Sequence, residues 1–352
     1  MKRKRISILV SFLLVLGSSF AQSDSIVKAD ILDSADVQAD KLYNSGITKL
    51  TQKQYKAALS DFSEAIKLKP DFEQAFYNRG VTYYEMKDHA KAITDFDSSI
   101  GLTENAGSYF TRGRCNEAIN KIDAAFADYS KAIEIKADYE QAFYYRGVIK
   151  FARNEYKEAI SDFTSAIDLN KRYTYAYNDR GSAKRQLGDF EGAIADYGTA
   201  IMIDNTIAFL HNNLGSAKRN AGDLKGAVRD YSKAISLDSK YTIAYNNRGS
   251  AKFDAGDYEE AIKDFTRATE LDGDYAYAYN NRAAAKFKLE DFKGAVDDCT
   301  KAIKINESYG YAYLNRGNAN EMLRNDAEAC GDWTKASELG IESANSHLGD
   351  CH

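Results

Sequence analysis

The chain has 352 residues, of which 44% are hydrophobic and 28% charged, and its formal net charge is −5. This balance excludes an intrinsically disordered chain. A single proline excludes collagen-like and proline-rich classes, and four cysteines are too few for a scaffold held together by disulfides. Abundant Ala, Lys, Asp and Glu favour helices instead.

The first residues have the three parts of a secretory signal peptide. Lys2 to Arg5 are all basic, Ile6–Leu16 is an apolar stretch interrupted only by two serines, and small residues stand three and one before a cut after Ala21. We therefore predict that residues 1–21 are removed on export, to the periplasm or outside the cell, and that no membrane span remains. Because this segment has four basic and no acidic residues, the remaining chain is more acidic, which disfavours nucleic acid as a partner.

The rest of the chain repeats with a period of 33 or 34 residues. A small residue recurs nine times, and an alanine follows each one twelve positions later. Four positions after the alanine, every repeat but one has an aromatic residue. The small column contains Gly46, Gly80, Gly113, Gly147, Gly181, Gly215, Gly249, Ala283 and Gly317. Such a period is typical of a solenoid in which each repeat contacts its neighbours.

Each repeat is predicted to be a pair of helices. Tyr245, Gly249 and Phe253 share one face of a first helix, and Ala261, Phe265 and Ala268 share one face of a second. Between the helices, a turn such as Gly256-Asp257 supplies a glycine that can end a helix in the left-handed conformation. The fold class is therefore all-α.

This pattern resembles the tetratricopeptide repeat, in a variety whose first helix reads Asn-Arg-Gly, as in Asn78-Arg79-Gly80 and Asn247-Arg248-Gly249. The resemblance implies an α-solenoid, a right-handed superhelix of about nine helix-turn-helix repeats over residues 39–340, with a concave groove lined by the first helices. Residues 22–38 are expected to be a polar linker or N-terminal cap. The segment from Trp333 to Gly349 is similar to the start of a Sel1-like repeat, and residues 341–352 are expected to be a C-terminal cap.

The cysteines near the C-terminus have two interpretations. Cys330 and Cys351 lie in the last repeat and the cap, and a disulfide is the favoured interpretation for an exported protein. The alternative is a metal site of His347, Cys351 and His352. We expect no metal and no cofactor. Phosphate loops, His-Glu-x-x-His and Gly-x-Ser-x-Gly are all absent from the sequence, so no catalytic residue and no enzyme activity is expected.

Charged residues form two further columns. An arginine precedes most of the glycines, and an aspartate precedes each residue of the aromatic column. Pairing of these arginines and aspartates between helices is favoured over a track of arginines that binds polyanions.

Lys184, Arg185, Lys218 and Arg219 form a basic cluster, either a solvated face or a place for an acidic partner. The sixth repeat is irregular, because His211 takes an aromatic position and Leu214 replaces the arginine.

Two columns are candidates for the groove. The resemblance implies that asparagines of the first helices hold a peptide backbone, and the alternative is a purely structural role. Aromatic side chains of the same helices are either anchors for a partner or packing between helices. The candidate groove residues are Asn78, Asn213, Asn247, Asn281, Asn315, Tyr175, Phe209, Tyr277 and Tyr311.

The sequence therefore predicts an exported, non-enzymatic scaffold that binds proteins or peptides in its groove. The alternative function is a module that binds glycans or cell-wall fragments, or assists an enzyme, through the groove tyrosines.

Overall fold

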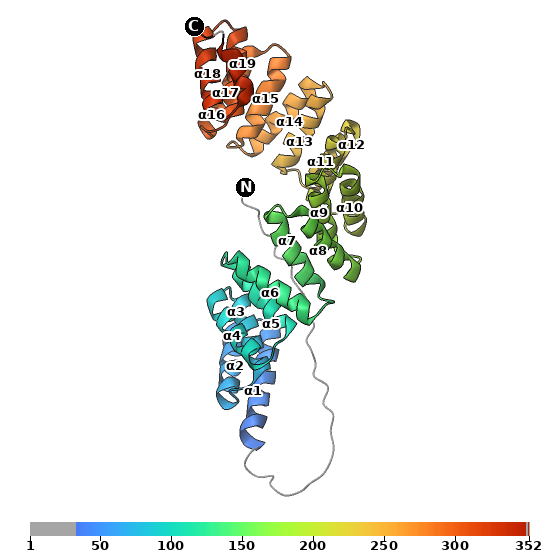
Figure 1. Ribbon diagram of the computed structural model, residues 1–352, viewed down its shortest axis with the longest axis vertical. Helices are drawn as coiled ribbons and strands as arrows, with labels where there is room; N and C mark the ends of the chain where they lie inside the picture. The colour runs from blue at the N-terminus through green and yellow to red at the C-terminus, as the bar shows by residue number, and fades with distance from the viewer. Residues whose placement is uncertain (1–32, 350, 352) are drawn as a thin grey trace. The chain divides into compact units, whose positions relative to one another are not determined.

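The computed structural model describes residues 33–349 and residue 351. The predicted signal peptide and most of the predicted linker lie outside the described residues. The chain divides into two parts at Leu102, and each part is an array of helices without strands among the described residues. Consecutive helices of each part lie side by side (Figure 1).

The N-terminal part, coloured blue to cyan in Figure 1, holds two repeats. Its helices are α1 (Asp33–Thr51), α2 (Tyr55–Leu68), α3 (Glu73–Glu85) and α4 (His89–Leu102). Helix α1 begins six residues before the expected start of the array at residue 39, so residues 33–38 are the beginning of a helix. Ala39 is fully buried and packs with Phe72 and Ala75.

The C-terminal part holds seven repeats and a short final segment. Each repeat has one odd-numbered first helix and one even-numbered second helix. The pairs are α5 (Ala106–Ala118) with α6 (Ile122–Ile135), α7 (Glu140–Ala152) with α8 (Tyr156–Leu169), α9 (Thr174–Gln186) with α10 (Phe190–Ile203), α11 (Ala208–Asn220) with α12 (Leu224–Leu237), α13 (Thr242–Asp254) with α14 (Tyr258–Leu271), α15 (Ala276–Lys288) with α16 (Phe292–Ile305) and α17 (Gly310–Met322) with α18 (Asp326–Glu338). The expected all-α class is confirmed, and the described residues contain nine helix pairs, as predicted.

The glycine column permits the two helices of a repeat to approach closely. Phe265 of α14 is buried against Gly249 of α13, and a Cβ on that glycine would lie 2.8 Å from Cε1 of the phenylalanine. Tyr197, Tyr231 and the other ring residues of the column fill the same space in their repeats. In the repeats that have a ring in this column, the core is thus an alanine-lined gap filled by one large side chain.

The turn between the helices requires one residue with positive φ. Gly256 has φ +85°, as the sequence pattern predicts. Lys53, Asn154 and Glu290 occupy the same conformation in other repeats, with φ between 60° and 63°. The turn geometry therefore persists where the glycine does not, at a cost in backbone strain.

The arginine column joins three helices. Nη2 of Arg248 donates to Asp264 at 2.6 Å, Nε donates to the same carboxylate, and Nη1 reaches Oγ of Ser232 in the preceding repeat at 3.0 Å. A lysine one turn on, Lys252, holds the second aspartate oxygen at 2.8 Å. Equivalent pairs recur in both parts, so these arginines are used within the fold rather than as a track for polyanions.

The final segment covers the end of the last repeat. It consists of η1 (Glu342–Ala344) and α19 (Asn345–Leu348). Ala344 is fully buried beside Trp333. The ring of His347 stacks on the indole of Trp333, with centroids 4.6 Å apart. These contacts shield an apolar surface that would otherwise face water.

Candidate functional site

The asparagines predicted to line a groove bond to one another. Nδ2 of Asn247 donates to Oδ1 of Asn212 in the preceding first helix at 3.0 Å, and Nδ2 of Asn281 donates to Oδ1 of Asn246 at 3.0 Å. The same contact joins Asn213 to Asn178 and Asn315 to Asn280, each at 2.9 Å. In the N-terminal part, Asn78 donates to the hydroxyl of Tyr43 at 3.0 Å.

This asparagine ladder fastens neighbouring first helices. Asn212, Asn246 and Asn280, which accept the bonds, are at least nine-tenths buried, whereas Asn247 and Asn281, which donate them, are half-buried. One amide hydrogen of each donating asparagine is therefore committed to the fold. In the sequence, Asn212, Asn246 and Asn280 are each the first residue of an Asn-Asn pair, a signal that the prediction did not use.

The aromatic column divides into two halves. The rings of Tyr175 and Phe209 stack with centroids 6.2 Å apart, and both residues are half-buried. Tyr277 and Tyr311 are instead 54% and 56% exposed, on equivalent positions of α15 and α17. The ring of Tyr277 lies 5.0 Å from that of Tyr309. Packing and exposure thus both occur, in different repeats.

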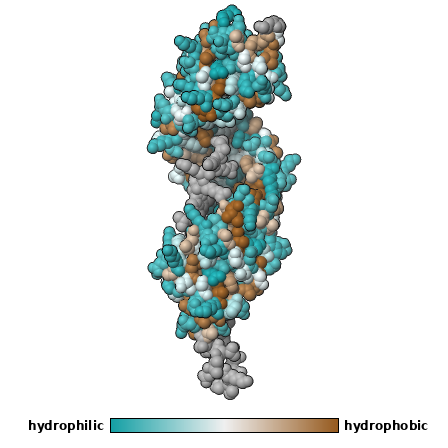
Figure 2. Space-filling view, turned by 90° about the vertical axis from the view of Figure 1, so that its left-hand side faces the viewer, coloured by the Kyte–Doolittle hydropathy of each residue, from teal (hydrophilic) through white to brown (hydrophobic). Residues whose placement is uncertain are grey.

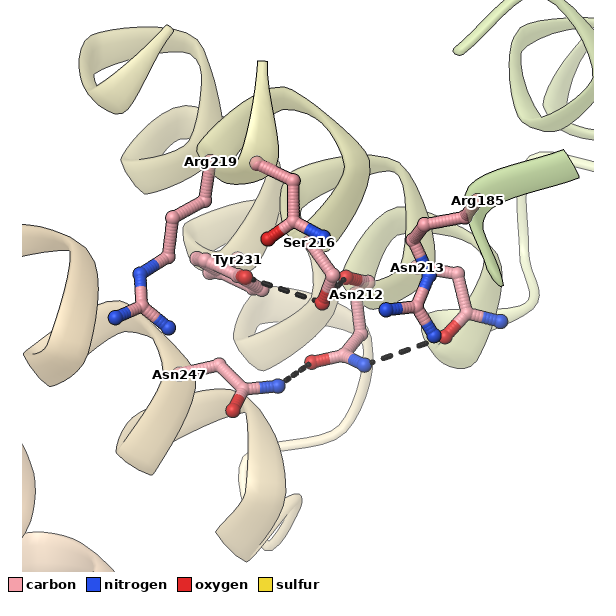
Figure 3. A pocket seen from close by; sticks show the side chains of 8 residues that line it. Arg185, Asn212, Asn213, Ser216, Arg219, Tyr231 and Asn247 are labelled. Atoms are coloured by element: carbon pink, nitrogen blue, oxygen red, sulfur yellow. Dashed lines mark hydrogen bonds between the residues drawn. The ribbon is translucent and has the colours of Figure 1, made fainter. Parts of the chain in front are cut away.

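A polar pocket opens beside the ladder, between α9, α11, α12 and α13 (Figure 3). Its volume is about 340 Å³. It is lined by Arg185, Asn212, Asn213, Ser216, Arg219, Asn220, Tyr231 and Asn247. Figure 3 shows two arginines on opposite sides, with Asn212 and Asn247 between them.

The four residues of the predicted basic cluster have different environments. Lys184 pairs with Asp196 at 2.8 Å and Lys218 with Asp230 at 2.6 Å, so both lysines serve the interior. Arg185 and Arg219 line the pocket. Arg219 also pairs with Asp254 at 2.6 Å, so Arg185 is the residue of the cluster that presents an unpaired charge there.

The tyrosine hydroxyls next to the arginines remain protonated. Burial raises the pKa of Tyr231 above its usual value, and the hydrogen bond with Ser216 and the charges of Arg219 and Arg185 oppose the shift only in part. The Tyr231 hydroxyl donates to Oγ of Ser216 at 3.1 Å. The pocket wall at this point is a neutral polar network, and its charge comes from the guanidinium groups.

Cys330 and Cys351 are joined in a disulfide, with Cα atoms 5.6 Å apart. The alternative metal set is incomplete in the described residues, because Cys351 is in this bond, His347 stacks on Trp333 and His352 lies outside them. No cluster of three His, Cys, Asp or Glu able to hold a metal occurs in the part of the chain that the structure describes. None of its helices is long and apolar enough to cross a bilayer.

The surface in Figure 2 is mostly hydrophilic, with hydrophobic residues in small groups. The largest exposures of apolar side chains belong to Met202, at 80%, and to the two tyrosines Tyr277 and Tyr311. Met202 lies on a second helix, α10, whereas the tyrosines lie on first helices.

Comparison with known proteins gives solenoids of the same kind. A tetratricopeptide repeat protein from Parabacteroides merdae is 18% identical, covers 69% of this chain and 97% of its own, and has a TM-score of 0.58. The Cut9–Hcn1 hetero-tetramer of the APC/C contains a chain that is 18% identical over 82% of this chain and 57% of its own, with a TM-score of 0.55. MamA is 30% identical over 49% of this chain and 94% of its own, with a TM-score of 0.43. No curated protein matches the chain.

Family models match most of the repeats. The model described as TPR repeat matches residues 50–87, 181–219, 215–255 and 249–290. Models described as Tetratricopeptide repeat match residues 73–105, 103–173 and 276–309. Together the matches cover well over half of the sequence and lie within the array of helix pairs described above. The chain belongs to the tetratricopeptide repeat family.

Proposed function

We propose that this protein is an exported, non-enzymatic scaffold that binds proteins or peptides with the face formed by its first helices. The observation that carries the proposal is the exposure of Tyr277 and Tyr311, two large side chains at equivalent positions of neighbouring repeats. Exposed tyrosines on a rigid surface are effective anchors for a protein partner, because they bury much area and lose little side-chain entropy.

The asparagine ladder supports the same proposal. Asn247, Asn281 and Asn315 tie each first helix to the one before it. A surface fixed in this way is ordered before a partner arrives, which lowers the entropic cost of binding. Asn281 and Asn315 lie on the same helices as Tyr277 and Tyr311, and their side-chain carbonyl oxygens can accept hydrogen bonds from a peptide.

Export is supported by residues 1–21, which have the composition of a signal peptide. The experiment is to express the whole chain and determine the N-terminus of the product. Export predicts that it starts at Gln22. A product in the cytoplasm that retains Met1–Ala21 would contradict export without affecting the proposal about binding.

The binding proposal is tested by crosslinking in intact cells, followed by identification of the captured partner. We expect one partner to be captured by the unchanged protein and lost from the double variant Tyr277→Ala/Tyr311→Ala. Met202→Ala is the matched control, because it removes an exposed apolar side chain from a second helix. Equal capture by the double variant would show that the tyrosines are not the anchors.

A second candidate rests on the same tyrosines, because aromatic rings also stack on sugars. Under this alternative the protein binds glycans or cell-wall fragments, or assists an enzyme that acts on them. Calorimetric titration with purified soluble cell-wall fragments distinguishes the two. Fragment binding that requires Tyr277 and Tyr311, together with no captured protein, would favour the glycan function.

A further inference from the structure

The pocket beside the asparagine ladder contains one arginine whose charge is left without a carboxylate. Arg185 and Arg219 are equivalent residues of α9 and α11, 34 positions apart. In the next repeats the same position holds Phe253 and Phe287. The two arginines are therefore a local departure from the repeat pattern, and the pattern itself does not require them.

The two arginines differ in their partner from the following repeat. Nε of Arg219 donates to Oδ2 of Asp254 at 2.6 Å, 35 residues further on. The residue 35 positions after Arg185 is Asn220, a neutral amide that also lines the pocket. No carboxylate of the described residues pairs with Arg185, and its Nε is buried without a hydrogen-bond partner.

Amides line the pocket beside the guanidinium of Arg185, which has no carboxylate partner among the described residues but interacts with the hydroxyl of Tyr197. Asn213, Asn220 and Asn247 line the pocket together with the two arginines, and Asn212 joins Asn247 within the ladder (Figure 3). Each amide offers two N–H groups, of which the ladder uses one from Asn213 and one from Asn247. The pocket thus combines cationic and neutral donors, and a planar acceptor with two oxygens fits such a set.

We propose that this pocket binds the side-chain carboxylate of an aspartate or glutamate in a peptide that lies along the first helices. This inference rests on the proposed function and adds the class of residue that the peptide must carry. The volume of about 340 Å³ is at the lower end for ligand pockets and suits one acidic side chain rather than a cofactor.

The charge of the whole protein makes the pocket selective. The chain has a formal net charge of −5, so its average field repels an acidic partner. Nearby lysines do not change this, because Lys184 and Lys218 are paired with core aspartates. An acidic peptide residue is therefore favoured at Arg185 and disfavoured over most of the surface, which fixes where along the array it docks.

The experiment uses the whole mature chain and two fluorescein-labelled peptides, one of alternating Gly and Glu and one of alternating Gly and Gln. Binding is followed by fluorescence anisotropy at low ionic strength. We expect the Glu peptide to bind at least about tenfold more tightly than the Gln peptide, since hydrogen bonds between charged groups are roughly twice as strong as neutral ones. Equal binding of the two peptides would overturn the proposal.

Three variants locate the binding. Asn220→Asp gives Arg185 the internal carboxylate that Arg219 already has, and Arg185→Gln removes the charge. Each is expected to weaken binding of the Glu peptide about tenfold. Asp254→Asn frees Arg219 from its carboxylate partner, and we expect this variant to bind the Glu peptide several-fold more tightly. Unchanged affinity in both Asn220→Asp and Arg185→Gln would overturn the proposal.

Controls match the change in net charge. Arg229→Gln, on the exposed side of α12, makes the protein more acidic by one charge, as Arg185→Gln and Asn220→Asp do. Glu191→Gln, exposed on α10, makes it less acidic, as Asp254→Asn does. We expect both to bind the Glu peptide like the unchanged protein. If the control variants changed the affinity as much as the pocket variants, net charge alone would explain the result, and the proposed site would be overturned.

Competitors distinguish the sources of the anion. Glutarate should displace the Glu peptide only at far higher concentration, because it lacks contacts along the first helices. Displacement by glutarate or inorganic phosphate as strong as that by unlabelled Glu peptide would reassign the pocket to a small anion and overturn the proposal. If the Glu peptide fails to bind while Tyr277→Ala/Tyr311→Ala still loses its cellular partner, this inference is wrong and the proposed function stands.

Discussion

Ala283 of α15 packs against Cys299 of α16, in the one repeat where the small column is not glycine and the aromatic column holds no ring. In the preceding repeat, a Cβ at Gly249 would lie 2.8 Å from a ring carbon of Phe265. The added methyl group and the lost ring therefore compensate each other. The pair shows that the two columns share one fixed volume.

Restoring only the ring should destabilise this repeat. We expect Cys299→Phe to lower the free energy of unfolding by about 1–3 kcal/mol, because the ring meets the Cβ of Ala283. Adding Ala283→Gly should recover most of the loss. Urea unfolding of both single variants and the double variant measures the coupling. Strictly additive effects would contradict the shared volume.

The ion pair of Arg282 and Asp298 should make the protein sensitive to acid. Burial acts to raise the pKa of Asp298, but hydrogen bonds from Arg282 and Lys286 outweigh it and hold the pKa below its usual value. Because the pKa of Asp298 in the folded state is below its unfolded value of about 3.9, the ionised carboxylate stabilises the fold at pH values above about 3.9. This contribution is lost as pH falls through the pKa of the folded state.

Asp298→Asn tests this contribution. The Asp298 side chain is only 2% exposed, and losing its charge leaves two cations without their carboxylate, so we expect a loss of about 3 kcal/mol at neutral pH. The variant should also lose less stability than the unchanged protein between about pH 4 and pH 2. Urea midpoints across this range measure both, with exposed Glu191→Gln as the control.

His211 should make the sixth repeat weaker at mildly acidic pH. It is 7% exposed, and burial lowers its pKa, opposed only in part by the Asn205 backbone and by Asp230. Because the folded pKa is lowered, protonation favours unfolding as pH falls below the unfolded value of about 6.5. His211→Phe should remove this loss between pH 7 and pH 5, measured by hydrogen exchange in α11. An unchanged pH profile would contradict it.

The disulfide makes a prediction about the number of reactive thiols. Burial raises the pKa of both Cys115 and Cys299 to about 12, so neither forms a thiolate at neutral pH. We expect Ellman's reagent to find no reactive thiol in the native protein, two after unfolding, and four after unfolding with reductant. Four thiols in the unfolded chain without reductant would exclude the bond.

Removing the bond should loosen the cap alone. Cys330→Ser/Cys351→Ser opens a loop of 21 residues, which is worth about 3 kcal/mol by chain entropy. Repeats of a solenoid contact only their neighbours, so the loss should appear as faster hydrogen exchange in η1 and α19. Exchange rates in α9 to α12 should stay the same and provide the internal control.

The sequence was sufficient for the helix pairs because their columns encode close contacts directly. Gly249 and Phe265 must meet, and their spacing allows only one arrangement of two helices. The start of α1 at Asp33 was not predicted, since the residues before Ala39 are mostly polar and their helix is stabilised by packing of later residues. The role of Asn246 as an acceptor was missed because it depends on a contact between repeats.

The pocket also escaped prediction for a physical reason. The basic cluster is visible in the sequence, but the sequence does not show in which direction each lysine and arginine side chain points. Lys184 and Lys218 turn to the aspartates of the second helices, and Arg185 and Arg219 line the pocket. The difference between Asn220 and Asp254 can be interpreted only once the structure shows that Arg219 contacts the residue 35 positions further on.

The arginine that clamps three helices has a consequence for how the gene can change. Arg248 contacts Ser232 and Asp264, which lie 16 residues before and after it, and Arg282 contacts Thr266 and Asp298 at the same offsets. If residues 241–274 were deleted in frame, Arg282 would contact Ser232 in place of Thr266 and would keep its contact with Asp298. The number of repeats can therefore change by duplication and loss while these contacts are re-formed, but a change between Arg185 and Asn247 would alter the residues that line the pocket.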